Sequence, residues 1–97
     1  MHARVTNLKF RPDAMDQSIT LYEQQIMPII KAQPGFQGVY LMTDRATGSA
    51  VSITMWNSEA EGRAYESNGT YRQMVGMVAA NFAAPPTLAT YEVEAHG

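Results

Sequence analysis

Three tyrosines stand in segments with helical spacing and have side chains that can take part in chemistry. Tyr22 lies on an apolar stripe in the first half of the chain, and Tyr65 and Tyr71 lie in the second helical region. A phenol can donate a hydrogen bond or act as an acid at the edge of an apolar pocket. The alternative for each is a packing role, with the hydroxyl at the rim. We take Tyr65 and Tyr71 as candidate acids, because their helical region is expected to line a cavity.

Asn7 is a second kind of candidate, because asparagine is disfavoured inside a strand. Its amide can orient a substrate or hold the edge of a pocket. The alternative is an asparagine that faces solvent or a dimer partner, since periodicity does not say which side is covered. Arg63 and Arg72 can stabilise a phenolate, although exposure on the surface is the ordinary state of an arginine.

The composition excludes several kinds of site. The 97 residues include no cysteine, and the two histidines, His2 and His96, lie near the ends, where chains are usually mobile. A disulfide framework, a zinc ribbon, a cysteine-ligated cluster and a thiol nucleophile are therefore excluded, and we expect no metal and no cofactor. The net charge of -2 without a basic run argues against nucleic acid and membrane surfaces as partners. We expect one cytoplasmic domain over residues 1–97.

The first half of the chain predicts a strand followed by a long helix. Residues 3–10 alternate, which is typical of a strand, and Pro12 suits the first turn of a helix. Pro28 is expected to bend that helix or loosen its last turn, because proline removes a backbone donor. Five residues form the predicted apolar stripe: Met15, Ile19, Tyr22, Ile26 and Ile29.

The second half predicts a hairpin, a second helical region and a last strand. Ser58 with Glu61 forms the pattern of a capping box, so a helix is expected to begin there. In order, the predicted elements are strands over 36–43 and 50–56, a helix from Ser58, a further helix from Thr70 that includes Phe82, and, after Pro85 and Pro86, a strand over 87–94.

This order predicts an α+β fold of the ferredoxin-like βαββαβ type, in which two helices cover one face of a four-stranded antiparallel sheet. The other face would still carry large side chains on the middle strands, among them Tyr40, Met42, Val51 and Ile53. Such a patch is normally covered, so we expect a homodimer in which two sheets pack face to face.

Three segments carry a resemblance to a known family. They are residues 29–36 (IIKAQPGF), residues 52–58 (SITMWNS) and residues 59–65 (EAEGRAY). In these segments and in the order of its elements, the chain resembles the antibiotic biosynthesis monooxygenase family of dimeric α+β barrels. The resemblance implies cofactor-independent oxygenation by dioxygen of a small electron-rich aromatic, quinol or polyketide-like substrate.

The resemblance also implies site residues. In the family, a tryptophan at the end of the third strand borders the substrate pocket, and here that tryptophan is Trp56. Its indole N–H can donate to a substrate oxygen, although a large residue of the core is the alternative. Some members carry an asparagine four residues earlier, where this chain has Ser52, whose hydroxyl can still donate. The candidate site is therefore Trp56, Asn7, Ser52, Tyr65 and Tyr71.

The sequence also bears on three other functions: haem degradation, RNA recognition and non-catalytic ligand binding. Related haem-degrading proteins have a haem-ligating histidine in the second helix, but the corresponding residue here is Val75, so haem degradation is not expected. An RNA-recognition domain would need aromatic and basic residues on the third strand, which residues 49–55 lack. A non-catalytic dimer that binds a small hydrophobic metabolite, or acts in a stress response, stays open, because the same pocket would serve it.

Overall fold

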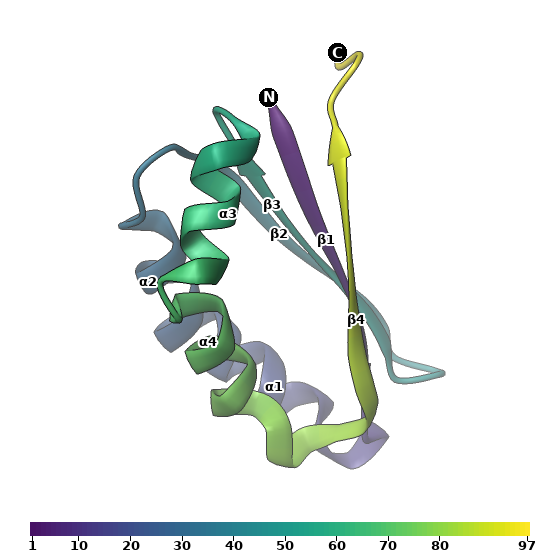
Figure 1. Cartoon of the computed structure of the whole chain (residues 1–97). Helices are drawn as coiled ribbons and strands as arrows, with labels where there is room; N and C mark the ends of the chain where they lie inside the picture. Colours follow the sequence, from purple (N-terminus) through teal and green to yellow (C-terminus); the bar gives the residue numbers. More distant parts are fainter.

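Four strands and two helical regions alternate along the chain (Figure 1). The structure is a computed structural model that describes all residues from 1 to 97. The elements are β1 (His2–Phe10), η1 (Pro12–Ala14), α1 (Met15–Leu21), η2 (Tyr22–Ile26), α2 (Met27–Lys31), β2 (Phe36–Asp44), β3 (Ser49–Trp56), α3 (Glu59–Ser67), α4 (Thr70–Val78), η3 (Ala79–Asn81) and β4 (Phe82–Glu92). None of the helices has the length and apolar character needed to cross a bilayer.

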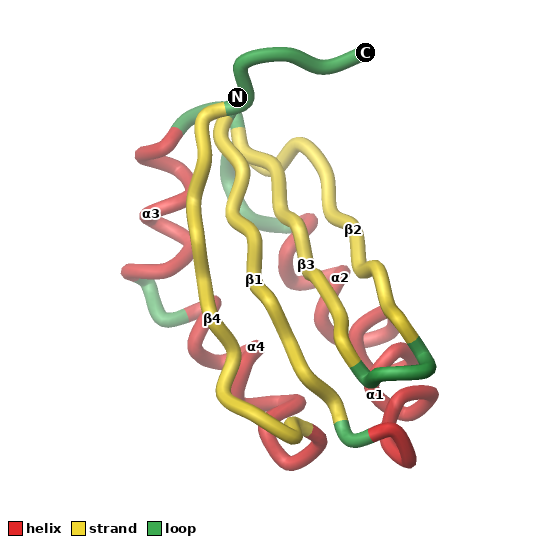
Figure 2. Tube along the Cα trace, turned by 90° about the vertical axis from the view of Figure 1, so that its right-hand side faces the viewer, coloured by secondary structure: helices red, strands yellow, loops and turns green.

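The strands form one antiparallel sheet in the order β2-β3-β1-β4. All the helices lie on one side of this sheet, and the other side carries no element of the chain (Figures 1 and 2). This arrangement confirms the predicted ferredoxin-like α+β fold. We call the side under the helices the covered face and the other side the open face.

The first helical region changes its winding just before Pro28. The segment η2 is a π-helix, in which the N–H of Met27 donates to the carbonyl of Tyr22, five residues earlier. Pro28 has no N–H to give and its ring crowds the turn before it, and a wider turn accommodates both effects. The helix is therefore widened in the turn before Pro28, and not in its last turn as predicted, since α2 is a regular α-helix. A π turn takes more residues than an α turn, so Ile30, at 1% exposure, occupies the fully buried place predicted for Ile29.

The second helical region begins as predicted but ends earlier. The side chain of Ser58 accepts a hydrogen bond from the N–H of Glu61, which confirms the cap of α3. The prediction that the last helix includes Phe82 was wrong, because α4 ends at Val78 and Phe82 begins β4. The proline pair at 85 and 86 lies inside this strand. Since β4 is an edge strand, it can include residues that lack an N–H.

The two faces of the sheet carry different side chains. On β1, Arg4 and Thr6 lie on the covered face with Leu8 and Phe10, and all four are buried. The open face carries, in cross-strand pairs, Val5 with Ile53, Ile53 with Tyr40, and Val51 with Met42. Tyr40 is 62% exposed and Tyr91, further along the same face, is 57% exposed. The open face of the isolated chain is therefore an apolar surface in contact with solvent.

Candidate functional site

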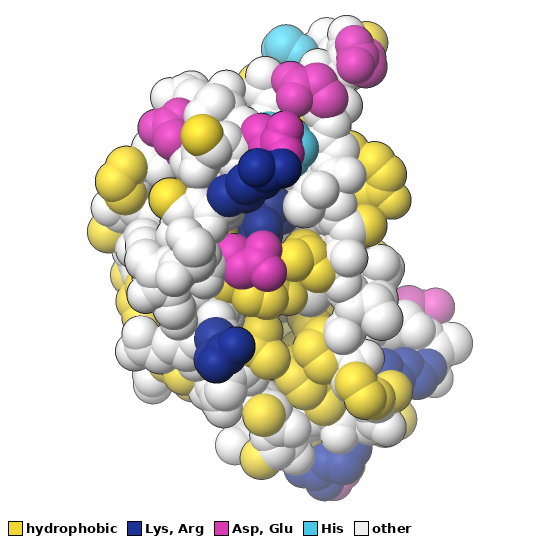
Figure 3. Space-filling view, in the orientation of Figure 1, with side chains coloured by type: hydrophobic (Ala, Val, Ile, Leu, Met, Phe, Trp, Pro, Cys, Tyr) yellow, Lys and Arg dark blue, Asp and Glu magenta, His cyan; other side chains and the backbone are white.

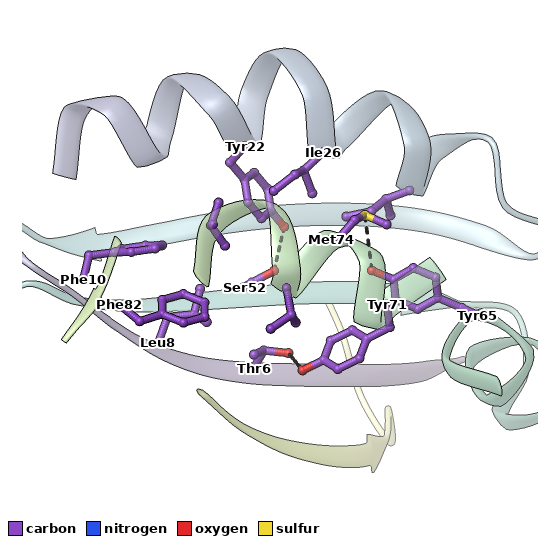
Figure 4. Close-up of a pocket in the computed structure, with 13 residues that line it drawn as sticks. Thr6, Leu8, Phe10, Tyr22, Ile26, Ser52, Tyr65, Tyr71, Met74 and Phe82 are labelled. Carbon is purple, nitrogen blue, oxygen red and sulfur yellow. Dashed lines mark hydrogen bonds between the residues drawn. The ribbon is translucent and has the colours of Figure 1, made fainter. Parts of the chain in front are cut away.

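A small apolar cavity lies between the covered face and the helices. Its volume is about 40 Å³, which is room for a few water molecules and less than the roughly 150 Å³ that admits a benzene ring. Figure 4 shows the side chains that converge on it from both layers. They are Thr6, Leu8, Phe10, Tyr22, Ile26, Ile30, Ser52, Tyr65, Tyr71, Met74, Val75, Val78 and Phe82. Eleven of the thirteen are hydrophobic, so the few hydroxyl groups set its chemistry.

Local periodicity brings these residues together. Alternation along β1 directs Thr6 and Leu8 toward the helices, and alternation along β3 does the same for Ser52. Tyr22 and Ile26 are four residues apart, so they lie on one face of the π-helical segment η2. This π turn therefore stands directly over the cavity, in keeping with the frequent use of such turns at functional sites.

Tyr22 and Ser52 form the shortest polar contact of the cavity. The two hydroxyl oxygens are 2.6 Å apart, and they join the helix layer to the sheet (Figure 4). Burial raises the pKa of Tyr22, although the hydrogen bond from Ser52 acts in the opposite direction. The phenol therefore stays protonated at neutral pH and can donate a hydrogen bond.

Tyr71 separates the cavity from a wider cleft on the surface. Its hydroxyl lies 3.3 Å from that of Thr6, and its side chain lines both spaces. The cleft has a volume of about 360 Å³ and is bounded by Glu66, Tyr71, Arg72, Val75, Pro86 and Leu88. In Figure 3, hydrophobic side chains gather in the hollow between the α3–α4 side and β4, with acidic and basic side chains beside it. Tyr71 and Val75 are the two residues that line both the cleft and the cavity.

Tyr65 closes the end of the cavity nearest α3. Its ring stacks on Trp56 with 4.9 Å between the centroids, and its hydroxyl donates to the sulfur of Met74 at 3.8 Å. Burial raises the pKa of Tyr65 strongly, and interaction with Tyr22 raises it further, against the opposing charge of Arg4. A phenol with such a pKa is a poor proton donor in acid catalysis but a competent hydrogen-bond donor, and its present partner is a weak acceptor.

Trp56 lies one layer behind the cavity. The side chain is fully buried, and its indole N–H donates to the hydroxyl of Thr54 at 2.9 Å. Phe36 packs edge-on against the same ring. Trp56 is not among the residues that line the cavity and reaches it only through the stacked ring of Tyr65.

Asn7 lies outside the cavity. It is exposed on the open face, paired with Val51 of β3 and Thr87 of β4. Of the five predicted site residues, the structure brings Ser52, Tyr65 and Tyr71 together at the cavity. It places Trp56 behind Tyr65, and it places Asn7 on the other side of the sheet.

Arg4 belongs to the surroundings of the site and was missed in the sequence. It is buried to 3% exposure, and its Nη1 lies 2.9 Å from Oε2 of Glu66. Gly62 allows this close packing, because a Cβ there would lie 3.4 Å from both Arg4 and Trp56. Alternation along β1 does place Arg4 on the same side as Thr6, and this was the available signal. Alternation alone does not show which side of the strand the helices cover.

The other candidates from the sequence lie apart from the cavity or carry no chemistry there. Arg63 pairs with Glu59 on the surface of α3, and Arg72 lies at the cleft. His2, expected to be mobile, is instead buried in β1, with Nδ1 3.4 Å from Oε2 of Glu92. Val75, the residue that corresponds in sequence to the haem-ligating histidine of the haem-degrading proteins, lines the cavity. The structure contains no group of three His, Cys, Asp or Glu side chains that could hold a metal ion.

Comparison with solved structures shows the same fold in proteins of different activity. A monooxygenase of Streptomyces coelicolor, solved with nanaomycin D, has a TM-score of 0.83 at 14% identity, with 98% of this chain and 88% of that chain covered. A cofactor-independent oxygenase of Streptomyces nogalater has a TM-score of 0.75 at 14% identity, covering 98% and 94%. A haem-degrading protein of Mycobacterium tuberculosis, with two haems bound, has a TM-score of 0.79 at 16% identity, covering 100% and 99%.

Sequence comparison identifies the family. Two uncharacterised proteins of Mycobacterium tuberculosis strains are 36% identical over 55 residues, which is 57% of this chain and only 25% of their own length. The chain therefore matches about a quarter of these curated relatives. The sequence profile of the family described as antibiotic biosynthesis monooxygenase matches residues 1–77, which include β1, the whole first helical region, the hairpin and most of the second helical region. The chain belongs to the antibiotic biosynthesis monooxygenase family.

Proposed function

We propose that this chain is a cofactor-independent monooxygenase that oxidises a small electron-rich aromatic, quinol or polyketide-like compound with dioxygen. The observation that carries the proposal is the apolar cavity with its inward hydroxyl groups, of which Tyr22, Ser52, Tyr65 and Tyr71 are the polar members beside Thr6. Membership in the family supports a monooxygenase role, and the cavity is where such a substrate would bind.

The proposed reaction requires few groups from the protein. A ring CH2 group of an anthrone-type substrate loses a proton, and the resulting anion gives an electron to dioxygen. The carbon then forms a bond to oxygen, the O–O bond breaks, and the products are a ring carbonyl and water. All the electrons come from the substrate. The protein must hold the substrate in an apolar space, donate hydrogen bonds to the anion and the peroxide, and exclude bulk water.

The hydroxyl groups supply these hydrogen bonds. Tyr22 and Tyr65 remain protonated because burial raises the pKa of each. We assign Tyr65 as a donor to a substrate oxygen, because its hydroxyl now meets only the sulfur of Met74 at 3.8 Å. Ser52 is held by Tyr22 and serves as the orienting group. Trp56 acts as a positioning residue, since it touches the cavity only through Tyr65.

Substrate entry requires the cavity to open. A space of about 40 Å³ does not admit an aromatic ring, whereas the adjoining cleft has about 360 Å³. Tyr71 borders both spaces and is held by one hydrogen bond of 3.3 Å to Thr6. In this proposal, the Tyr71 ring swings aside when the substrate enters, and the substrate then fills the joined space.

The proposal includes a homodimer. The open face presents Val51, Ile53 and Met55 beside the exposed Tyr40 and Met42. Contiguous apolar surface of this kind is normally covered in a stable protein, and a second copy of the sheet matches it in shape and character. Asn7 would then lie in the interface between the two sheets rather than in a substrate site.

Oxygen consumption with a panel of neutral hydroquinones, naphthols and anthrones tests the proposal. We expect turnover by the wild type and a loss of about 100-fold in kcat for Tyr65→Phe and for Ser52→Ala, since one donor to a developing oxyanion contributes on that order. Trp56→Phe should lose less, because the stacked ring is kept. Ser67→Ala removes an exposed hydroxyl from α3, away from the cavity and the open face, and is the matched control that should behave as the wild type.

Two results would contradict the proposal in different ways. Turnover that is indifferent to Tyr65→Phe and Ser52→Ala would remove these residues from the site. The absence of turnover on every compound, with tight binding of some of them, would favour a non-catalytic protein that binds a hydrophobic metabolite.

A further inference from the structure

Arg4 buries two N–H groups that have no acceptor in the protein. The side chain is 3% exposed, and its only ion pair joins Nη1 to Oε2 of Glu66 at 2.9 Å. Nε and Nη2 are fully buried and have no hydrogen-bond partner. Buried polar groups of this kind are rare, because each one loses its interaction with water without replacement. The ion pair with Glu66 therefore satisfies only part of the guanidinium.

The two unpartnered groups share one edge of the guanidinium. Nε–H and one N–H of Nη2 point the same way, parallel to each other, and this edge binds both oxygens of a carboxylate at once. Glu66 occupies the other terminal nitrogen, Nη1, and so leaves this edge free. The geometry of Arg4 therefore matches a carboxylate in a way that a lysine at the same place would not.

Arg4 lies directly behind the residues that separate the cavity from the cleft. Its guanidinium carbon is 5.1 Å from the ring centroid of Tyr71 and 5.7 Å from that of Tyr65. Tyr71 and Glu66 both line the cleft, and the side chain of Glu66 is 52% exposed. The movement of Tyr71 that joins the cleft to the cavity would therefore also uncover the guanidinium.

We propose that Arg4 binds the carboxylate of an aromatic acid, and that aromatic acids are the ligand class of this site. The inference rests on the proposed function in one respect, namely that the cavity and the cleft together form the ligand site. The ring system fills the apolar space, and the carboxylate binds to Nε and Nη2 of Arg4. Glu66 already pairs with Nη1 of the same guanidinium, so the carboxylate of the ligand and that of Glu66 would repel each other across it.

The arrangement of charge favours Arg4 over the other arginines. Arg63 is 76% exposed and pairs with Glu59 on the outer side of α3. Arg72 borders the cleft but is exposed to solvent, where an ion pair contributes little. Arg4 is surrounded by aromatic rings and carries its charge in a medium that screens it less, so its interaction with a carboxylate is the stronger one.

Isothermal titration calorimetry under argon with 2-naphthoate and 2-naphthamide tests this inference. The two ligands share one ring system and differ in the charge of one planar group. We expect the wild type to bind 2-naphthoate at least about tenfold more tightly than 2-naphthamide, as befits hydrogen bonds to a charged group. Arg4→Gln should bring the ratio of the two affinities to about one, with the larger loss of affinity for 2-naphthoate. Arg63→Gln removes the same charge from α3 and is the matched control, which should keep the preference.

Glu66→Gln gives a second readout with the opposite sign. Removing this second negative charge should raise the affinity for 2-naphthoate several-fold relative to that for 2-naphthamide. This variant changes a half-exposed side chain, so it remains informative if Arg4→Gln does not fold. Equal affinities for the two ligands in the wild type, no binding of either, or a preference that survives Arg4→Gln would each overturn the inference.

The calorimetric result is independent of oxygenation. A preference for 2-naphthoate that depends on Arg4, without oxygen uptake on any compound, would support the ligand class and contradict the proposed reaction. Oxygen uptake with neutral quinols and no preference for 2-naphthoate would support the proposed reaction and contradict the ligand class.

Discussion

Each face of the sheet departs in one respect from what a simple globular protein would have. The covered face includes Arg4, Thr6 and Ser52, which are polar groups placed under a layer of helices. The open face includes Val51 and Ile53 on its central strand, where solvent contact would favour polar residues. Burying polar groups and exposing apolar ones both oppose folding of an isolated chain. In the function proposed above, a ligand would satisfy the polar groups on one side and a second sheet would cover the apolar side chains on the other.

The covered face itself has a closed end, around Trp56, and a cavity end. At the closed end, Trp56 is fully buried between Phe36 and Tyr65, with its N–H on Thr54. Next to it, the cavity leaves the rings of Tyr71 and Phe82, which lie at its two opposite ends (Figure 4), incompletely packed. We infer that the closed end stabilises the fold and that the cavity end gives up packing for binding.

The largest expected effect is on the closed end. Trp56→Ala should lower the free energy of unfolding by about 3–5 kcal/mol, because truncation of a fully buried aromatic leaves a large cavity. Urea denaturation followed by circular dichroism measures this loss. Trp56→Phe, which keeps the stacked ring, is the matched control and should lose clearly less. A loss below about 1 kcal/mol for Trp56→Ala would contradict the division between a stabilising end and a binding end.

The second largest expected effect is on dimer association through the open face. Ile53→Glu places a charge at the centre of the apolar patch, beside Val5 and Tyr40. Burial of an unpaired charge in an interface costs several kcal/mol, so the dimer dissociation constant should rise by roughly 100-fold or more.

Sedimentation velocity over a range of concentrations measures this change. Gln24→Glu adds the same charge to an exposed site on the helix layer and should leave the association unchanged. A monomeric wild type at micromolar concentration would show that the open face has no second sheet as its partner.

The smallest effect is a dependence of stability on alkaline pH. Burial raises the pKa of Tyr22 and of Tyr65 above the ordinary value, so above pH 10 the unfolded chain releases protons that the folded chain retains. Below the pKa that these tyrosines have in the unfolded chain, their titration therefore does not change the free energy of unfolding. It falls as the pH rises from there toward the folded pKa, by at most about 1.4 kcal/mol per pH unit for each tyrosine.

Urea denaturation between pH 8 and 11.5 measures this slope. Tyr22→Phe removes one of the two titrating groups and should reduce the slope. An unchanged slope in that variant would show that Tyr22 is more accessible to solvent than the covered face suggests.

Most of the fold could be predicted from the sequence because its elements have distinct periods. Alternation over β1 and β3 and the cap at Ser58 gave the order of strands and helices. The spacing predicts a helix that includes Phe82, because this residue continues the apolar period and a proline pair follows. The spacing could not show that Pro85 and Pro86 lie on an edge, where no hydrogen-bond partner is lost.

The site could be predicted only in part. Tyr65, Tyr71 and Ser52 reach the cavity, because helical spacing and strand alternation carry them there. Asn7 and Arg4 stand on opposite sides of the same strand, and their roles depend on which side the helices cover. That choice is made by packing between distant elements, which a pattern within one strand does not contain.

The π turn at η2 has a consequence for how this chain is compared with others. An α-helix turns by about 100° per residue, so an additional residue in one turn rotates every later side chain by that angle. Tyr22 and Ile30 both reach the core because the turn between them is wide. A protein with the same fold and no proline at the position of Pro28 is therefore expected to be one residue shorter between these two anchors. An alignment that places a single-residue gap there will superpose matching side chains, and an ungapped one will not.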